Sequence, residues 1–391
     1  MKFLHTAFQN MKAPFEEGGK FEKYNKALTA IDALETFTFT PEEVTKTGSH
    51  IRDGIDLKRT MSVVIMAMVP CLLFGMYNAG FQHYRELGEL ASASFMDMFS
   101  IGLVKVLPIV LVSYGVGLGI EFGFAMYKGH SVEEGYLVTG MLIPLIVPVD
   151  IPLWMLAIAV AFAVVFGKEV FGGTGMNILN VALTARAFLF FAYPTFMSGD
   201  KIWVHGGMEN DAISGATILG DLAGMKEGLE NLRFTVDEML FGFVPGSIGE
   251  TSLIAILIGA AILILTGIGS WRVMLSAVAG GAVMGLIFNF FGANGLMEFP
   301  WYQHMMVGGF AFGVVFMATD PVTAAQTNTG KWVYGFLIGI LAIMIRVFNP
   351  AYPEGIMLAI LFMNVMAPLI DHYVVEANIQ RRLKRLTVKT A

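Results

Sequence analysis

The fold of this chain is decided by two short apolar segments, Gly135-Tyr-Leu-Val-Thr-Gly-Met-Leu-Ile-Pro-Leu-Ile-Val-Pro148 and Gly308-Gly-Phe-Ala-Phe-Gly-Val-Val-Phe-Met-Ala-Thr-Asp-Pro321. Both begin with glycine and close with Asp or Pro. Both are shorter than the roughly 20 residues that a helix needs to cross about 30 Å of hydrocarbon. Each is the third of five apolar segments. Because five is odd, the second set would run in the opposite sense, so we predict two inverted repeats.

The composition places this pattern in a membrane. Hydrophobic residues make up 55% of the 391 residues and charged residues 14%, whereas about a quarter of a soluble domain is charged. The mean hydropathy is +0.66. We predict an all-α polytopic membrane protein of about ten transmembrane helices, at residues 61–79, 100–127, 134–148, 151–168, 176–193, 252–269, 271–291, 304–318, 332–348 and 355–374. Backbone freed by the short, broken helices must face protein or water, which favours a translocation site near the midplane.

The distribution of basic residues predicts the orientation. With the N-terminus inside, the outer loops hold only Arg85, Lys201, Lys226 and Arg233 among the 25 Lys and Arg residues. This bias predicts that both termini are cytoplasmic. The N-terminal stretch has no continuous apolar core, so no signal peptide is expected. We divide the chain into an N-terminal arm, a first repeat, an outer-face loop, a second repeat and a basic tail, at residues 1–57, 58–193, 194–251, 252–375 and 376–391.

The outer-face loop contains the stretch Asp211-Ala-Ile-Ser-Gly-Ala-Thr217-Ile-Leu. A threonine hydroxyl can accept a phosphate group, and the small residues Ser214, Gly215 and Ala216 would let a bulky group approach the backbone. Taken alone, the same residues also suit an ordinary turn. The single cysteine, Cys71, excludes a disulfide within the chain and an iron–sulfur cluster held by its cysteines alone.

Several longer runs make the chain resemble a known family. They are Gly48-Ser-His-Ile-Arg-Asp-Gly-Ile-Asp-Leu-Lys-Arg59, Lys168-Glu-Val-Phe-Gly-Gly-Thr-Gly175, Met317-Ala-Thr-Asp-Pro-Val322, Asn349-Pro-Ala-Tyr-Pro-Glu-Gly355 and Arg381-Arg-Leu-Lys-Arg385. With Ser214-Gly-Ala-Thr217, which resembles a flavinylation motif, they resemble the B subunits of the Na+-translocating NADH:quinone oxidoreductases nearly from end to end. The resemblance implies a component of a hetero-oligomeric respiratory complex in the bacterial inner membrane.

The resemblance also implies cofactors and a substrate. Thr217 would carry FMN through a phosphoester bond, and Asp211 and Ser214 would be recognised by a separate flavin transferase. A noncovalent riboflavin would bind near Gly173, Asn177 and Asn180. Quinone would bind near Gly117 and Glu121, where glycines equally suit close helix packing. We expect no metal site, no catalytic side chain of this chain's own and no nucleic-acid partner.

Two of these residues can also be read from their spacing. Asn177 and Asn180 lie three residues apart, so on a helix they would share one face. Amides inside a membrane need partners, which could be a flavin ring, the backbone or another helix. The family often has Asn-Pro-Ala-Leu where this chain has Asn180-Val-Ala-Leu. The glycine-rich turn before them is not a dinucleotide fingerprint, because no strand precedes it and its spacing differs.

Acidic residues and two apolar stripes suggest an ion path. Glu121, Asp320 and Asp371 lie in or beside predicted spans, where carboxylates often mark ion routes for cations such as Na+. The basic residues within spans, Lys105, Arg186 and Arg346, could instead neutralise them. The stripes could form an apolar constriction that excludes water and ions, or could simply pack; they comprise Val138, Met141, Leu142 and Leu145 on the first short segment and Phe312 and Phe316 on the second.

Two other functions remain open from the sequence. The homologous membrane subunit of Rnf-type ferredoxin:NAD+ oxidoreductases shares the flavinylated loop and the ten-helix plan. The stretch Phe15-Glu-Glu-Gly-Gly-Lys20 in the polar arm favours the quinone-reducing complex. A channel or transporter without redox activity would also suit inverted repeats.

Overall fold

The computed structural model describes residues 2–15, 31, 35, 39, 45, 47–51, 54, 57–128, 135–207, 215–224, 232–349 and 355–387. These residues form helices, turns and irregular segments, and none of them lies in a β-strand. The all-helical class expected from the sequence is confirmed over this part of the chain.

The helices fall into two sets, separated by an irregular segment. After α1 (Lys2–Lys12), the first set comprises α3 (Leu57–Glu86), α4 (Phe95–Lys128), α5 (Tyr136–Leu145), α6 (Leu153–Gly167) and α7 (Val181–Ala192). The second set comprises α10 (Leu253–Leu265), α11 (Trp271–Phe291), α14 (Phe310–Phe312) running into a π-helix (Gly313–Met317), α15 (Asn328–Phe348) and α16 (Ile356–Thr387). Short connecting elements are η2 (Glu169–Phe171), η3 (Pro194–Phe196), α8 (Ile218–Gly224), α9 (Val236–Phe241), α12 (Gly295–Glu298) and α13 (Trp301–Met306).

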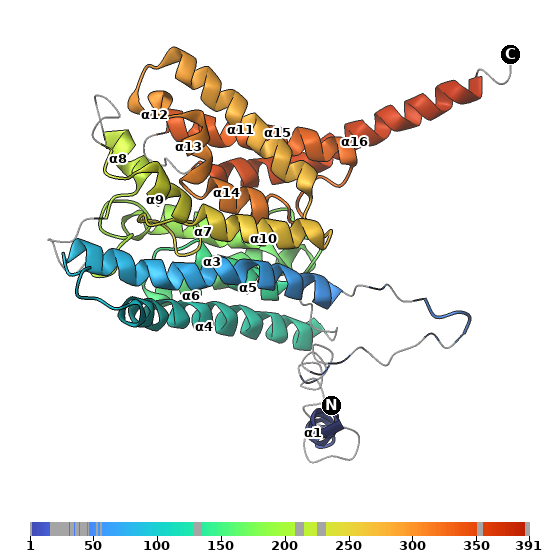
Figure 1. Cartoon of the computed structure of the whole chain (residues 1–391). Helices are drawn as coiled ribbons and strands as arrows, with labels where there is room; N and C mark the ends of the chain where they lie inside the picture. The colour runs from blue at the N-terminus through green and yellow to red at the C-terminus, as the bar shows by residue number, and fades with distance from the viewer. Residues whose placement is uncertain are drawn as a thin grey trace.

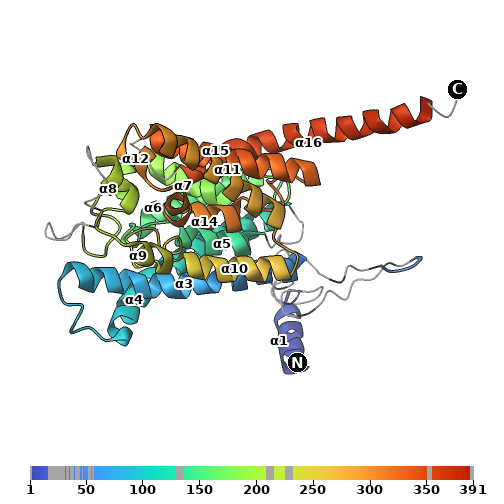
Figure 2. The same ribbon diagram turned by 45° about the horizontal axis from the view of Figure 1, so that its top comes forward.

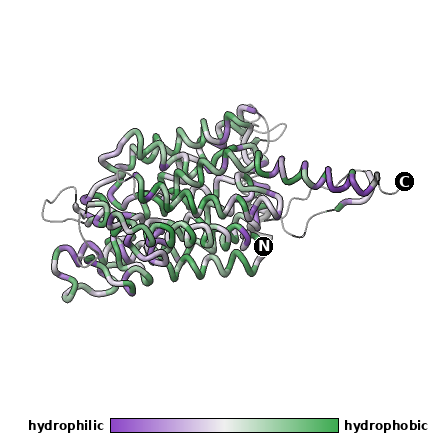
Figure 3. The backbone as a smooth tube through the Cα atoms, turned by 90° about the horizontal axis from the view of Figure 1, so that it is seen from above, coloured by the Kyte–Doolittle hydropathy of each residue, from purple (hydrophilic) through white to green (hydrophobic). Residues whose placement is uncertain are grey.

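Six helices are long and apolar enough to cross a membrane, judged by length and composition over the described residues: Leu57–Glu86, Phe95–Lys128, Leu153–Phe171, Trp271–Phe291, Asn328–Phe348 and Ile356–Arg385. Three more apolar helices, α5, α7 and α10, have 10, 12 and 13 residues. Many large apolar side chains point outward, as lipid contact requires; Leu265 and Phe290 are each 86% exposed. Figure 3 shows apolar residues along the bundle and polar residues toward its ends and at the end of α16.

The bundle has two distinct ends. Helix α3 begins, and α16 leaves, at the same end, which we call the inner end (Figure 1). Helices α8 and α9 lie at the opposite end, which we call the outer end. Helix α16 projects well beyond the bundle in both ribbon views (Figure 2) and carries Arg381, Arg382, Lys384 and Arg385 on its projecting part.

Local chemistry explains the two short helices. In α5, Pro144 lies inside the helix, and the helix stops at Leu145, shortly before Pro148. Proline lacks the N–H that would continue the helical hydrogen bonds. The second short helix follows Gly308 and Gly309, whose φ angles of 65° and 67° favour glycine. Both short helices expected from the sequence are therefore present.

The two sets share part of their packing, although α3 packs on α4 while α10 makes no comparable contact with α11. The second helix of each set packs on the fourth, as α4 on α6 and α11 on α15, and the fourth on the fifth, as α6 on α7 and α15 on α16. The sets meet first helix to first helix, α3 on α10, and fifth to fifth, α7 on α16. The short helices thereby come to lie in the interior, where α5 and the π-helix are mostly buried.

Candidate functional site

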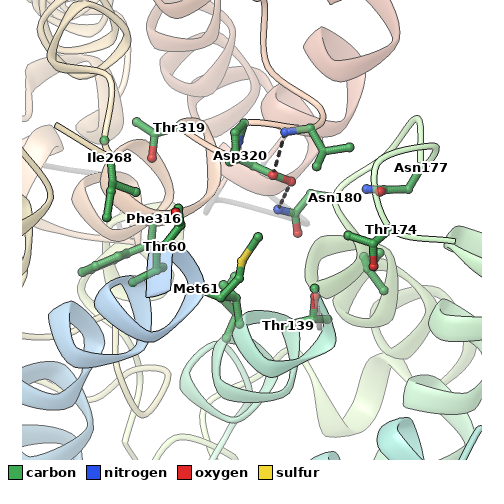
Figure 4. A pocket seen from close by; sticks show the side chains of 18 of the residues that line it. Thr60, Met61, Thr139, Thr174, Asn177, Asn180, Ile268, Phe316, Thr319 and Asp320 are labelled. Carbon is green, nitrogen blue, oxygen red and sulfur yellow. Dashed lines mark hydrogen bonds between the residues drawn. The ribbon is translucent and has the colours of Figure 1, made fainter. Parts of the chain in front are cut away.

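A cavity at the inner end of the bundle encloses about 800 Å³ of empty space, including its opening to the outside. Its walls come from the start of α3, from α5, from the segment before α7 and from the segment after the π-helix. Figure 4 shows Asn180 facing Asp320, with Asn177 and Thr174 to one side and Phe316 to the other. Met61, Val64, Leu142 and Phe316 supply apolar wall, and Thr60, Thr139, Lys168, Asn177 and Asn180 supply polar groups.

The cavity has the chemistry that a flavin ring needs. Small-molecule sites are mostly apolar and contain a few fixed polar groups. Here amide, hydroxyl and ammonium groups surround apolar walls, and they match the carbonyls and ring nitrogens of an isoalloxazine. Two of the three residues that the resemblance assigned to riboflavin, Asn177 and Asn180, line this cavity. The third, Gly173, does not line it; its φ of 103° and its N–H bond to the Lys168 carbonyl (3.1 Å) close the adjacent turn.

Asn177 and Asn180 do not share a helical face, so that expectation is wrong. Helix α7 begins only at Val181, and Asn180 is its N-cap, because its side-chain oxygen accepts a hydrogen bond from Leu183 N (3.1 Å). Asn177 lies in the preceding turn and donates to the Leu179 carbonyl (3.1 Å). Val181 occupies the first helical position, where proline is common but not required, so the missing family proline leaves the helix start intact.

Asp320 joins the second set to this cavity. Its carboxylate accepts hydrogen bonds from Asn180 Nδ2 (3.3 Å), Thr323 Oγ1 (3.0 Å) and Val322 N (3.1 Å). Asn180 therefore fastens the start of α7 to the segment after the π-helix, and both residues face the cavity. This contact spans 140 residues of sequence.

Glu121 is linked to the same cavity by Lys168, a partner that the sequence pattern did not indicate. Its buried carboxylate forms an ion pair with Lys168, and both side chains are 3% exposed. Lys168 itself lines the cavity. Gly117, one turn earlier on α4, lies against the ring of Tyr136, and a Cβ there would overlap that ring. Close helix packing thus accounts for Gly117, while Glu121 lies one side chain from the cavity.

The third acid of the expected ion path, Asp371, has different surroundings. Asp371 is half-buried and accepts hydrogen bonds from Gln326 N (2.6 Å), Thr327 N (3.0 Å) and Thr327 Oγ1 (2.5 Å), so it fastens α16 to the start of α15. The cations expected as neutralising partners have other contacts: Lys105 pairs with Asp150 (3.3 Å) and Arg186 with Glu250 (2.7 Å), and Arg346 donates to carbonyls of His304 and Val307.

The two apolar stripes both reach the inner cavity. Val138, Leu142 and Phe316 line one wall of the inner cavity, and Met141, Leu145 and Phe312 are buried. The rings of Phe312 and Phe316 lie 4.9 Å apart at an interplanar angle of 49°. Residues of both short helices, Val138, Leu142 and Phe316, therefore line the same cavity.

A second cavity, of about 430 Å³ of empty space, lies at the outer end. Thr217 lines it together with Ser247, Glu250, Gly308 and Gly309. Thr217 is half-buried, and its Oγ1 accepts a hydrogen bond from Gly220 N (3.1 Å) at the start of α8. Accepting this bond leaves the hydroxyl oxygen able to form an ester.

Close packing, rather than room for an approaching group, explains the glycine two residues before Thr217. Gly215 N donates to the Asp200 carbonyl (2.8 Å), and a Cβ on Gly215 would overlap Val204. The expectation that Gly215 leaves room for an approaching group is therefore replaced by a packing requirement. Arg233 lies nearby, donating to the Ala216 carbonyl (3.5 Å) and pairing with Asp221 (3.0 Å). Asp211 and Ser214 lie outside the described residues.

Asp150 follows the first short helix as Asp320 follows the second, and it anchors the turn that contains His205 and Gly206. Its carboxylate accepts hydrogen bonds from Gly206 N (2.7 Å) and contacts His205 Nδ1 (2.8 Å). Burial raises the pKa of Asp150, but the hydrogen bonds from His205 and Gly206 and the charges of His205 and Lys105 outweigh it, so the pKa lies below its ordinary value.

The chain is similar to known proteins over nearly its full length. The family model described as "NQR2, RnfD, RnfE family" matches residues 44–380. The B subunit of the Na(+)-translocating NADH-quinone reductase of Chromohalobacter salexigens is 47% identical over 403 residues, which cover 98% of this chain and 96% of that protein. The subunits of the same name from Stutzerimonas stutzeri and Pseudomonas aeruginosa are 48% and 45% identical, covering 95% and 98% of this chain and 96% and 99% of theirs. The chain therefore belongs to the NQR2, RnfD, RnfE family.

Proposed function

We propose that this chain is the membrane-embedded B subunit of a Na+-translocating NADH–quinone reductase, a multi-subunit translocase. The relatives with this name cover almost the whole chain, and the helices are long and apolar enough for a multi-pass membrane protein. The family also includes RnfD and RnfE, but the three relatives above are all named as quinone reductase subunits, which favours this reading over the Rnf-type one.

The observation that carries this function is a pair of cavities at opposite ends of one bundle. Thr217 lines the outer cavity, and Asn177 and Asn180 line the inner one. When bound, FMN on Thr217 and riboflavin in the inner cavity would carry electrons toward quinone, which is chemistry that the cofactors supply. The chain's own residues position them. Gly220 N donates to the Thr217 oxygen, and the Arg233 guanidinium contacts the carbonyl of Ala216, next to Thr217, where it would attract a phosphate group.

The packing supports the ten-helix plan with two inverted repeats. Two pairs of corresponding helices make corresponding contacts, α4–α6 with α11–α15 and α6–α7 with α15–α16, and the sets meet first helix to first and fifth to fifth. The Lys and Arg residues support the orientation: Lys58, Arg59, Lys128 and Lys168 are at the inner end, as are the basic residues of α16. We accordingly assign the inner end to the cytoplasm, with both termini there, and the outer end to the far side of the bacterial inner membrane.

The ion path would run through the region where the short helices meet. Glu121, Asp320 and Asp371 lie toward the inner end, and the apolar side chains Leu145, Phe312 and Phe316 would close the route between turnovers. Quinone would bind beside Gly117 and Glu121, next to the inner cavity. In this arrangement Lys168 touches both regions, because it pairs with Glu121 and lines the cavity.

The test of the cofactor assignment is in-gel flavin fluorescence of the denatured polypeptide. The chain is expressed with its flavin transferase and partner subunits, as native sequence, as Thr217→Ala and as Thr139→Ala. Fluorescence is expected in the native chain and in Thr139→Ala, whose site is in the inner cavity, and not in Thr217→Ala. A dark native band, with the transferase shown to be active on another substrate, would remove the redox function and favour a plain transporter.

A further inference from the structure

A buried ion pair that the proposed function does not use lies beside the outer cavity. Arg186 in α7 donates from Nη1 to Oε1 of Glu250 (2.7 Å) and from Nη2 to Ser247 Oγ (3.3 Å). The two charged side chains are only 3% and 6% exposed. Removing two charges from water costs several kcal/mol for each, so an ion pair inside a membrane bundle is by default a functional feature.

The segment that carries Glu250 is inserted against the end of the first short helix. Gly249 N donates to the Leu145 carbonyl (2.7 Å), and Ile248 N donates to the Val147 carbonyl (3.3 Å). Leu145 is the last residue of α5, so its carbonyl has no helical partner, and Val147 lies two residues beyond the helix end. Gly249 is pressed against the Leu145 side chain, since a Cβ on it would lie 2.6 Å from Leu145 Cδ2.

The same segment also touches the start of the second short helix. A Cβ on Gly309 would lie 2.8 Å from the carboxylate of Glu250, so the carboxylate rests on the backbone there. Gly309 precedes Phe312 by less than one helical turn. The segment that carries Glu250 therefore contacts both the end of the first short helix, at Leu145, and the start of the second, at Gly309. Glu250 and Ser247 face the outer cavity.

We propose that the Arg186–Glu250 ion pair is the outer gate of the ion path. The proposal rests on the proposed function, because it needs the path to pass between the short helices. A cation that leaves the apolar region outward meets the Glu250 carboxylate, which can bind it only by exchanging it for the guanidinium. In the resting state the guanidinium is paired with the carboxylate and repels cations that arrive from the outside.

This gate predicts an asymmetry that a purely structural ion pair does not. Arg186→Gln leaves the carboxylate in place without its guanidinium, so cations can bind there and leak once the apolar constriction is also opened. Glu250→Gln leaves the guanidinium without its carboxylate, so the barrier to cations stays and outward transport slows. Arg186→Lys keeps a positive charge and stays closed. If the pair only held two segments together, Arg186→Gln and Glu250→Gln would have similar effects.

The experiment measures passive uptake of radioactive Na+ by proteoliposomes that contain the assembled complex, without NADH. Each variant is made in the Phe316→Ala background, because the apolar constriction lies in series with the ion pair and would otherwise block passive flux. In that background Arg186→Gln is expected to raise uptake about tenfold or more, because an unscreened charge at this distance outweighs thermal energy several-fold. Glu250→Gln and Arg186→Lys are expected to stay as tight as Phe316→Ala alone. Radioactive glucose must stay outside in every variant, which excludes a non-specific hole.

Phe316→Ala in the same assay separates this proposal from the proposed function. A leak in Phe316→Ala alone would overturn the gate and keep the path, because the intact ion pair should still block the route. No leak in Phe316→Ala/Arg186→Gln would overturn both. Equal leaks in Arg186→Gln and Glu250→Gln would show a structural lock. If Arg186→Gln does not assemble, the double variant Arg186→Gln/Glu250→Gln decides: the gate predicts a leak, and a lock held by neutral hydrogen bonds predicts none.

Discussion

Replacing Gly249 with alanine should disturb the junction of the short helices, and the structure gives the size of the effect. The added Cβ would lie 2.6 Å from Leu145 Cδ2 and 2.7 Å from Leu145 Cβ. Carbon atoms ordinarily approach to about 3.5–4.0 Å, so one side must move by about 1 Å. A rotamer change cannot relieve the contact, because Leu145 is fully buried and its own Cβ is involved. Overpacking of this kind costs about 1–3 kcal/mol.

The neighbouring glycine provides a matched control. In Gly246→Ala the new Cβ would lie 3.2 Å from Thr251 Cγ2, a terminal methyl group that can shift by the few tenths of an ångström required. We therefore expect a loss of less than about 1 kcal/mol, as for most tolerated substitutions. Both glycines lie in one segment and differ mainly in what faces them.

Thermal unfolding of the purified complex, followed by tryptophan fluorescence, measures the difference. Gly249→Ala should lower the midpoint by about 2–6 °C and Gly246→Ala by about 2 °C or less, given the usual relation between free energy and midpoint. The covalent flavin band should persist in both, since Thr217 is not altered. Equal shifts in the two variants, or an unchanged midpoint in Gly249→Ala, would refute the close packing of Gly249 on Leu145.

Three further predictions follow from the same structure. Phe312→Ala or Phe316→Ala should uncouple Na+ transport from electron flow, seen as undiminished quinone reduction with a smaller Na+ gradient in proteoliposomes; tight coupling in both variants would contradict the apolar constriction. Asn180→Ser keeps an N-cap for α7 but removes the amide, so it should lower the noncovalent flavin released by acid from the complex, whereas Asn289→Ser, at the outer end, should not. The pKa of Asp150 in the folded state lies below its unfolded value of about 3.9. Its contribution to stability is therefore complete above that value and is lost as the pH falls through the folded pKa. The acid side of a stability–pH curve should be flatter for Asp150→Asn, and an unchanged curve would contradict the role of its hydrogen bonds.

Local features of the chain were predictable from the sequence. The two short helices follow from glycine and proline at their ends, since these residues act on the backbone within one or two turns. The membrane class follows from composition. The flavinylation motif pointed to Thr217, and the structure then placed Thr217 at a cavity rather than on an open turn.

The contacts of the candidate site could not be predicted in the same way. Asn177 and Asn180 were expected on one helical face, and only the turn before α7 brings both to the cavity wall. Sequence patterns offered several partners for each buried charge and no means of choosing among them. In the tertiary structure Glu121 pairs with Lys168, 47 residues away in the sequence, and Arg186 pairs with Glu250, 64 residues away.

The sequence by itself thus determined the helical membrane class, the presence of two short helices and which hydroxyl lies in a flavinylation-type motif, because each of these depends on composition or on near neighbours along the chain. Only the tertiary structure decided which carboxylate meets which cation and which residues share a cavity. These choices depend on how the two sets of helices pack, and packing brings together residues as far apart as Asn180 and Asp320.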